Sequence, residues 1–270
     1  MTSPGPASGR TPVVFIHGLW LHADSWNDWC TLFREAGYDP SAPGWPGDSA
    51  SVAAANAHPE RLAKVGIAAA VEHYATLVRA LATRPILIGH SFGGLIAQKL
   101  LGMGVASGAI AIAPAQIRGV LPLPLAQLQS AFPVLGNPLN YWRAVPQTAR
   151  RFHRGFASAV SEQESNELFA RYAIPAPGRP LFEAAFANFF PNSPARVNRA
   201  ADRGPLLIIG GGKDRTVPEV VARAAHELYR KTKTVNEYQV FADRGHSVTI
   251  DHGWKEVATA TLAWLRSKAL

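Results

Sequence analysis

Apolar residues follow two different spacings along this chain. Short continuous runs, many rich in Val and Ile, alternate with stretches in which apolar residues recur every three or four positions. The first pattern is typical of buried strands and the second of amphipathic helices. Strands are predicted at 13–16, 38–42, 86–88, 109–113, 206–209 and 235–241, and helices at 25–36, 60–81, 95–101, from Thr216 onward and from Trp254 to Leu265. This alternation predicts an α/β fold in which helices cover both faces of a mostly parallel sheet.

Residues 114–203 interrupt the alternation. The segment begins rich in proline and then becomes helical, with Ser161 and Glu164 spaced as a capping box. A connection of about 90 residues is too long to join neighbouring strands of a compact sheet. We therefore expect a helical cap over the carboxyl edge of the sheet, an α/β body formed by 12–113 and 204–270, and a flexible N-terminus over 1–11.

Four phenylalanines of the predicted cap, Phe182, Phe186, Phe189 and Phe190, fall on one face of a helical pattern. Such a stripe packs the cap against the body, lines a substrate pocket, or does both. We take Phe186 and Phe190 as candidate substrate-binding residues.

The charged residues are distributed unevenly along the chain. The net charge is +8, and the predicted cap holds ten arginines and no lysine against five acidic residues. Only Arg150, Arg151 and Arg154 cluster, and they form either a solvated helix face or a phosphate-binding patch. Because the chain has no dense basic stripe and no motif that reads bases, we expect no nucleic-acid partner.

Several absences narrow the class of protein further. The single cysteine excludes a disulfide framework and a four-cysteine metal site. The histidines at 22, 58, 73, 226 and 252 show no ligand spacing, so we expect neither a metal nor a cofactor. No apolar run reaches the roughly 18 residues of a membrane-spanning helix, and the N-terminal residues lack a signal pattern. We expect a cytoplasmic protein without a membrane span.

The string Gly89-His90-Ser91-Phe92-Gly93 fits the pattern G-x-S-x-G. It follows a predicted strand directly and opens a predicted helix, which is the context that this motif requires. The two glycines permit a strained turn, so the Ser91 hydroxyl should project into the open as a nucleophile.

A serine hydroxyl needs a base, and the base needs a carboxylate to orient it. Asp214 and His246 each follow the end of a predicted strand, in the chain order Ser91, Asp214, His246. Because the carboxyl edge of a parallel sheet is where ligands bind, these three side chains form a candidate catalytic triad.

The loop His17-Gly18-Leu19-Trp20 follows the first predicted strand. Acyl transfer requires two backbone N–H donors at the developing oxyanion, and we assign these donors to Leu19 and Phe92. Trp20 is either a wall of the acyl pocket or a core residue.

Over residues 12–270 the chain resembles the α/β-hydrolase superfamily. The resemblance rests on Phe-Ile-His-Gly, Gly-His-Ser-Phe-Gly-Gly, Gly-Gly-Lys-Asp-Arg-Thr-Val-Pro and Gly-His-Ser. It implies Ser91 as nucleophile, His246 as base, Asp214 as its orienting acid and a helical cap. The usual opening hairpin of the superfamily is missing, as in small plant-type methylesterases and hydroxynitrile lyases, and this short start implies about six strands.

The resemblance also orders the functional hypotheses. Ser91 stands where dehalogenases and epoxide hydrolases carry aspartate, and Ser247 stands where hydroxynitrile lyases carry lysine. The first hypothesis is therefore a cofactor-free serine hydrolase that cleaves small carboxylic esters through an acyl-enzyme. The alternatives are a thioesterase for an acyl-CoA or carrier-bound substrate, and a non-catalytic ligand-binding protein of the same fold.

Overall fold

The computed structural model describes residues 9–270. The predicted flexible N-terminus falls largely on residues 1–8, outside the described residues. No helix within 9–270 is long and apolar enough to cross a membrane.

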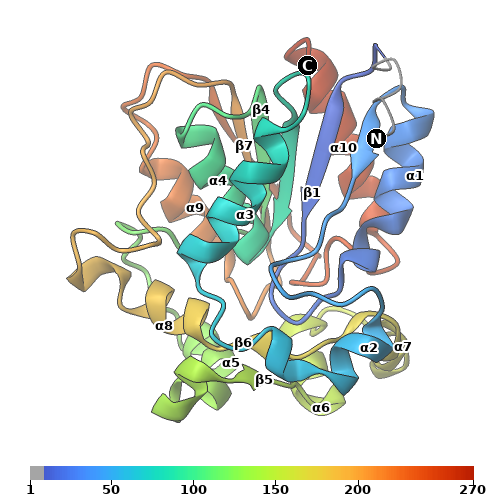
Figure 1. Cartoon of the computed structure of the whole chain (residues 1–270), viewed down its shortest axis with the longest axis vertical. Helices are drawn as coiled ribbons and strands as arrows, with labels where there is room; N and C mark the ends of the chain where they lie inside the picture. The colour runs from blue at the N-terminus through green and yellow to red at the C-terminus, as the bar shows by residue number, and fades with distance from the viewer. Residues whose placement is uncertain (1–8) are drawn as a thin grey trace, which may run out of the picture.

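Six parallel strands form the central sheet, as the alternating pattern predicts (Figure 1). Their order across the sheet is β2-β1-β3-β4-β7-β8, and every pairing is parallel. The strands are β1 (Pro12–Ile16), β2 (Asp39–Ser41), β3 (Ile86–His90), β4 (Gly108–Ile112), β7 (Leu206–Gly211) and β8 (Asn236–Phe241).

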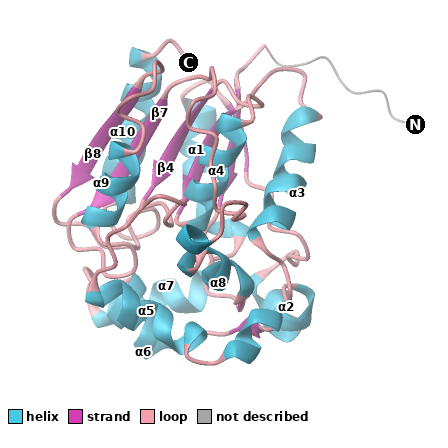
Figure 2. Cartoon of the chain, turned by 90° about the vertical axis from the view of Figure 1, so that its left-hand side faces the viewer, coloured by secondary structure: helices cyan, strands magenta, loops and turns pink. Residues whose placement is uncertain are grey.

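Helices cover both faces of this sheet (Figures 1 and 2). One face packs against α3 (Ile67–Arg79), α4 (Phe92–Gly102) and α9 (Glu219–Glu227). The other face packs against α1 (Asn27–Glu35) and α10 (Trp254–Ser267). Because both faces are buried, the four inner strands β1, β3, β4 and β7 are mainly apolar along their whole length. The edge strands β2 and β8 are partly exposed and carry polar residues.

Strand β1 contributes side chains to both hydrophobic cores. Its side chains alternate between the faces, as the period of two in a strand requires. Val14 and Ile16 enter the core beneath α3 and α4, whereas Val13 and Phe15 enter the core beneath α1 and α10.

The helix predicted at 60–81 is shorter in the structure. A 3-10 turn, η2 (Pro59–Arg61), is followed by α3, which begins only at Ile67 because Gly66 is extended with φ −107° and ψ 174°. The free N–H of Ile67 donates to the Glu183 carboxylate at 2.7 Å. This contact satisfies one of the unpaired donors at the helix N-terminus with a favourable negative charge.

The segment between β4 and β7, here called the inserted segment, lies below the sheet in Figure 1, beside α2 (Val52–Ala57). It contains α5 (Leu125–Leu135), η3 (Pro138–Trp142), β5 (Ala144–Val145), α6 (Ala149–Arg151), η4 (Phe152–Phe156), α7 (Glu162–Tyr172), β6 (Ala176–Pro177), α8 (Arg179–Ala185) and η5 (Ala187–Phe189).

Two features fix the inserted segment locally. The predicted capping residue Ser161 accepts a hydrogen bond from the Glu164 N–H at 3.1 Å and begins α7. The chain after α7 is joined to the loop after β1, because the Ile174 N–H donates to the Trp20 carbonyl at 3.1 Å. The inserted segment is therefore held against the loop that carries Leu19 and Trp20.

Candidate active site

Ser91 occupies a strained turn between β3 and α4. Its φ of 54° and ψ of −119° lie outside the regions that L-residues prefer. A Cβ on Gly89 would lie 2.1 Å from the Gly93 carbonyl oxygen, and a Cβ on Gly93 would lie 2.0 Å from that of Ile16. Only glycine fits at these two positions. Steric crowding at the turn therefore explains both glycines of the motif, as the sequence predicts.

His246 and Asp214 form a buried pair at the ends of β8 and β7. Nδ1 of His246 lies 2.6 Å from Oδ2 of Asp214, and both side chains are almost fully inaccessible. The other carboxylate oxygen, Oδ1, accepts from the N–H groups of Thr216 at 2.8 Å and Val217 at 2.7 Å. The carboxylate is thus fixed by three contacts, and it can fix the orientation of the imidazole in turn.

Thr216 therefore has a different place from the one expected. The sequence predicts a helix from Thr216 onward, but α9 (Glu219–Glu227) begins only after Pro218. The backbone N–H groups before the helix bond to Asp214 instead, because its carboxylate is the stronger acceptor at this turn.

Ser91 and His246 line the same cavity, of about 140 Å³, at the carboxyl end of the sheet. Within residues 9–270 Nε2 of His246 has no hydrogen-bond partner, so the Ser91 hydroxyl does not bond to it in this structure. Ser91 is also buried, with 6% of its surface exposed, and the expectation that its hydroxyl projects into the open is wrong. The inserted segment covers it, since residues of α5 and α8 close the cavity.

The two assigned oxyanion donors belong to residues that line this cavity. Phe92 is the first residue of α4, and the first N–H groups of a helix have no partner within it. Leu19 follows Gly18, whose position is tight because a Cβ there would lie 2.8 Å from Cβ of Ser91. The loop after β1 therefore packs closely against Ser91.

The walls of the cavity are mainly apolar and come from both parts of the fold. They include Leu19, Trp20, Phe92, Ala115, Leu123, Leu128, Ala131, Leu135, Phe156, Leu181, Ala184, Ala185 and Val217. Trp20 is buried and donates from its indole Nε1 to the Val145 carbonyl at 2.9 Å. Trp20 is therefore part of the cavity wall, and its hydrogen bond to the inserted segment holds its ring in place.

Phe186 and Phe190 are not brought to this cavity. Their side chains are 51% and 61% exposed, and neither residue lines it. Helix α8 ends at Ala185 and continues as the 3-10 turn η5, which breaks the helical spacing that placed these rings on one face. Leu181, Ala184 and Ala185 of α8 line the cavity instead.

Phe156 is a site residue that the sequence pattern does not reveal. It ends η4, a single π-helical turn, and its ring meets the His246 imidazole edge to face at a centroid distance of 4.9 Å. It also packs against His90, whose centroid lies 5.7 Å away. A π-helical turn has no residue signature of its own, so its aromatic ring could be located only in three dimensions.

His90 lies behind the turn and supports His246. Its Nε2–H donates to the His246 carbonyl at 2.9 Å, and the two rings are 4.6 Å apart. Burial lowers the pKa of His90 far below its ordinary value, and the neighbouring His246 lowers it further. His90 is therefore a neutral packing and hydrogen-bonding residue. In residues 9–270 no three His, Cys, Asp or Glu side chains are grouped to hold a metal ion.

Comparisons with known proteins agree with this architecture. Residues 13–260 match the family described as "Alpha/beta hydrolase family", and the chain belongs to this family. No curated protein matches the chain by sequence.

Solved structures show the same fold at low sequence identity. A monoacylglycerol lipase from Paleococcus ferrophilus is 21% identical with a TM-score of 0.69, covering 96% of each chain. A methylesterase from Arabidopsis is 18% identical with a TM-score of 0.64, covering 95% of this chain and 98% of its own. A pyrethroid hydrolase from Sphingobium faniae is 17% identical with a TM-score of 0.68, covering 96% and 98%.

Proposed function

We propose that this α/β hydrolase is a serine hydrolase that cleaves carboxylic esters through an acyl-enzyme, with Ser91, His246 and Asp214 as its triad. The observation that carries the proposal is the 2.6 Å contact between His246 Nδ1 and Asp214 Oδ2, with Ser91 in the same cavity as the imidazole. A base held by a buried carboxylate beside a serine on a strained turn is the arrangement that nucleophilic acyl transfer needs. The related lipase, methylesterase and pyrethroid hydrolase structures support this reaction class by fold.

In the proposed mechanism His246 Nε2 accepts the proton of the Ser91 hydroxyl while Oγ attacks the ester carbonyl. The N–H groups of Leu19 and Phe92 stabilise the oxyanion of the tetrahedral intermediate. His246 then gives its proton to the departing alkoxide. Water, deprotonated by the same imidazole, attacks the acyl-enzyme, and the acid leaves as the bond to Ser91 breaks and His246 returns the proton to Ser91 Oγ. Throughout, Asp214 accepts the hydrogen bond from Nδ1 and holds the imidazole in place.

The absent Ser91–His246 hydrogen bond is compatible with this mechanism. Such contacts are often long in a free enzyme and shorten when substrate binds. Ser91 and His246 line the same cavity, and Nε2 has no competing partner among residues 9–270. The nitrogen is therefore available to accept the proton.

The acyl chain of the substrate should be short. The cavity at Ser91 has a volume of about 140 Å³, well below the roughly 300–1,000 Å³ of pockets that take drug-sized ligands. Its walls are apolar, so an aliphatic acyl group gains free energy on entering it. We propose that the inserted segment acts as the cap of the enzyme, because α5 and α8 form the walls opposite Ser91.

A fluorophosphonate probe tests the proposed nucleophile. The wild-type protein should be labelled, and Ser91→Ala should abolish the label. Ser130→Ala is the matched control, because Ser130 is another serine that lines the cavity and its loss should leave labelling of Ser91 intact. Absence of labelling in the wild type from pH 6 to 9, or persistent labelling in Ser91→Ala, would overturn the proposal.

A further inference from the structure

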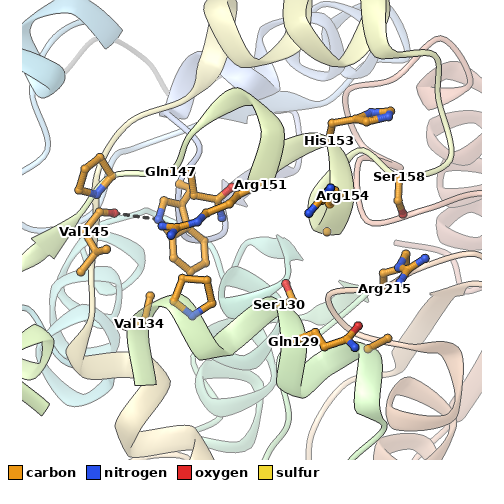
Figure 3. Close-up of a pocket in the computed structure, with 15 residues that line it drawn as sticks. Gln129, Ser130, Val134, Val145, Gln147, Arg151, His153, Arg154, Ser158 and Arg215 are labelled. Atoms are coloured by element: carbon orange, nitrogen blue, oxygen red, sulfur yellow. Dashed lines mark hydrogen bonds between the residues drawn. The ribbon is translucent and has the colours of Figure 1, made fainter. Parts of the chain in front are cut away.

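A second and larger cavity lies next to the apolar one. Its volume is about 680 Å³, and Trp20 and Ser130 line both cavities. Figure 3 shows its lining, which comprises Trp20, Ala126, Gln129, Ser130, Pro133, Val134, Val145, Pro146, Gln147, Arg151, His153, Arg154, Gly155, Ser158 and Arg215. At this junction Ser130 Oγ lies 3.3 Å from Oγ1 of Thr216, another lining residue of the apolar cavity.

The second cavity is strongly basic. Arg151, Arg154 and Arg215 line it, and none of its lining residues, all within the described 9–270, is acidic. In that same part of the chain, none of the three guanidinium groups makes an ion pair with a carboxylate. Arginine is always charged in proteins. Three arginines, each partly exposed to solvent, therefore line one cavity that has no carboxylate in its wall.

Uncharged polar atoms in the same cavity wall also lack partners. Gln147 Oε1, His153 Nδ1 and Ser158 Oγ are buried atoms without a hydrogen-bond partner in residues 9–270. Buried polar atoms are nearly always satisfied in folded proteins. In Figure 3 Gln147 lies beside Arg151, whereas His153, Arg154, Ser158 and Arg215 lie on the opposite side. The Ser158 hydroxyl and a protonated His153 Nδ1 are donors that, together with the unpaired arginines, indicate a site for a polar, negatively charged group.

The arginines reach the cavity from separate elements. Arg151 ends α6, Arg154 lies in the π-helical turn η4, and Arg215 follows Asp214 in the loop after β7. The same turn places Phe156 against His246, so the basic cavity and the reacting groups share one short stretch of backbone. This position fits a site for part of the substrate and not a remote patch of surface charge.

We infer that the basic cavity binds a phosphate group on the alcohol portion of the ester substrate. The inference rests on the proposed function, since the acyl portion occupies the apolar cavity at Ser91. A phosphate monoester carries about −1.5 to −2 charges near neutral pH and several acceptor oxygens, which matches three guanidinium groups better than a single carboxylate does. The ester bond then lies at Ser91, and the alcohol portion extends past Trp20 and Ser130, which line both cavities.

A pair of substrates tests this assignment. The phosphate ester 2-(phosphonooxy)ethyl butyrate and the neutral 2-methoxyethyl butyrate share the acyl group and differ at the far end of the alcohol. For the wild type, kcat/KM should be at least about tenfold higher for the phosphorylated ester than for the neutral ester. A factor of this size is the effect of one charge-assisted hydrogen bond. Arg154→Gln should reduce this ratio about tenfold, and Arg151→Gln should act in the same direction.

Arg150→Gln is the matched control. Arg150 belongs to the same short helix as Arg151, is exposed, and does not line the cavity, but it contributes the same charge to the net charge of +8. The ratio of the two kcat/KM values should not change in this variant. An equal drop in Arg150→Gln and Arg154→Gln would show general attraction by the basic surface and would overturn the assignment. Equal rates for the two esters in the wild type would overturn it as well.

A binding measurement separates this inference from the proposed reaction. In a calorimetric titration, inorganic pyrophosphate should bind to the wild type at least about tenfold more tightly than to Arg154→Gln. Unchanged affinity in Arg154→Gln would overturn the phosphate site even if esters are hydrolysed. Conversely, selective pyrophosphate binding together with no fluorophosphonate labelling would uphold the site and reject the serine hydrolase mechanism.

Discussion

Nε2 of His17 lies 3.4 Å from Oδ2 of Asp48, and both side chains are buried. The contact joins the end of β1 to the loop after β2. Trp45 strengthens the same junction, because its indole Nε1 donates to the His17 carbonyl at 3.0 Å. His17 is two residues before Leu19, so the position of the proposed oxyanion donor depends on this buried pair.

Asp48→Asn should lower stability most at neutral pH. Burial raises the pKa of Asp48, but the His17 imidazole, with help from His22 and the Ser49 N–H, lowers it more, so the pKa lies below its ordinary value. A carboxyl with a lowered folded-state pKa stabilises the protein above the unfolded pKa of about 3.9 and loses that contribution as pH falls. We expect a loss of about 1–3 kcal/mol in the free energy of unfolding at pH 7.

Urea unfolding at pH 7 and at pH 3 measures this effect. The difference between wild type and Asp48→Asn should shrink as pH falls. Asp202→Asn removes an exposed carboxylate and should change stability little at either pH. An Asp48→Asn difference that is the same at both pH values would contradict a role for the ionised carboxylate.

Asp214→Asn should lower kcat by about four orders of magnitude, because an amide presents the wrong hydrogen-bonding partner to His246 Nδ1. The fold should tolerate the change, since the amide oxygen can still accept from Thr216 and Val217. Steady-state hydrolysis of p-nitrophenyl butyrate measures the loss. Asp243→Asn, an exposed acid in the loop after β8, serves as the control. Near-wild-type activity in Asp214→Asn would mean that another acid orients the histidine.

The volume of the apolar cavity predicts the preferred acyl length. Among p-nitrophenyl esters, acetate and butyrate should give kcat/KM values at least about tenfold above octanoate, because a long chain cannot enter without displacing packed side chains. A rising preference up to octanoate would show that the acyl chain binds elsewhere.

Leu181→Ala and Phe186→Ser compare a residue of α8 that lines the apolar cavity with a residue just after α8 that does not. Leu181 lines the apolar cavity, so truncating it should enlarge the cavity and shift the preference toward longer acyl chains. Phe186 is half exposed outside it, and Phe186→Ser should leave the preference unchanged. A chain-length shift in Phe186→Ser would restore the sequence-based expectation that this ring contacts substrate.

Gly93→Ala should destabilise the protein by about 3 kcal/mol or more, because its Cβ would lie 2.0 Å from the Ile16 carbonyl oxygen in the backbone of β1. Gly94→Ala is the matched neighbour. Its Cβ would lie 3.0 Å or more from the surrounding atoms, so a smaller loss of about 1 kcal/mol is expected. Urea unfolding ranks the two, and equal losses would show that the steric argument is wrong.

The sheet and the three proposed triad positions could be predicted from sequence because they depend on local patterns. Buried parallel strands leave continuous apolar runs, and the tight turn at Ser91 requires glycines at fixed spacing. Since the carboxyl ends of such strands meet at one edge, the sequence alone predicts that Asp214 and His246 lie close together. Their 2.6 Å contact agrees with that pairing.

The inserted segment could not be predicted to the same depth. Its helices are short, and the face that each helix buries depends on contacts with distant loops, such as Ile174 with Trp20. The phenylalanine spacing predicted one continuous face, but α8 ends before Phe186. The partly exposed arginines at 151, 154 and 215 are separated in sequence and meet only because α6, η4 and the loop after β7 converge.

The π-helical turn at Phe152–Phe156 has a consequence for engineering this protein. A π-helical turn holds more residues than an α-helical one, so deleting one residue would restore ordinary helical spacing and rotate every later side chain. Phe156 would then leave His246 and Arg154 would leave the basic cavity in a single step. A deletion in this turn therefore cannot alter acyl preference and anion recognition independently, and independent tuning requires single side-chain substitutions such as Leu181→Ala for the one and Arg154→Gln or Arg151→Gln for the other.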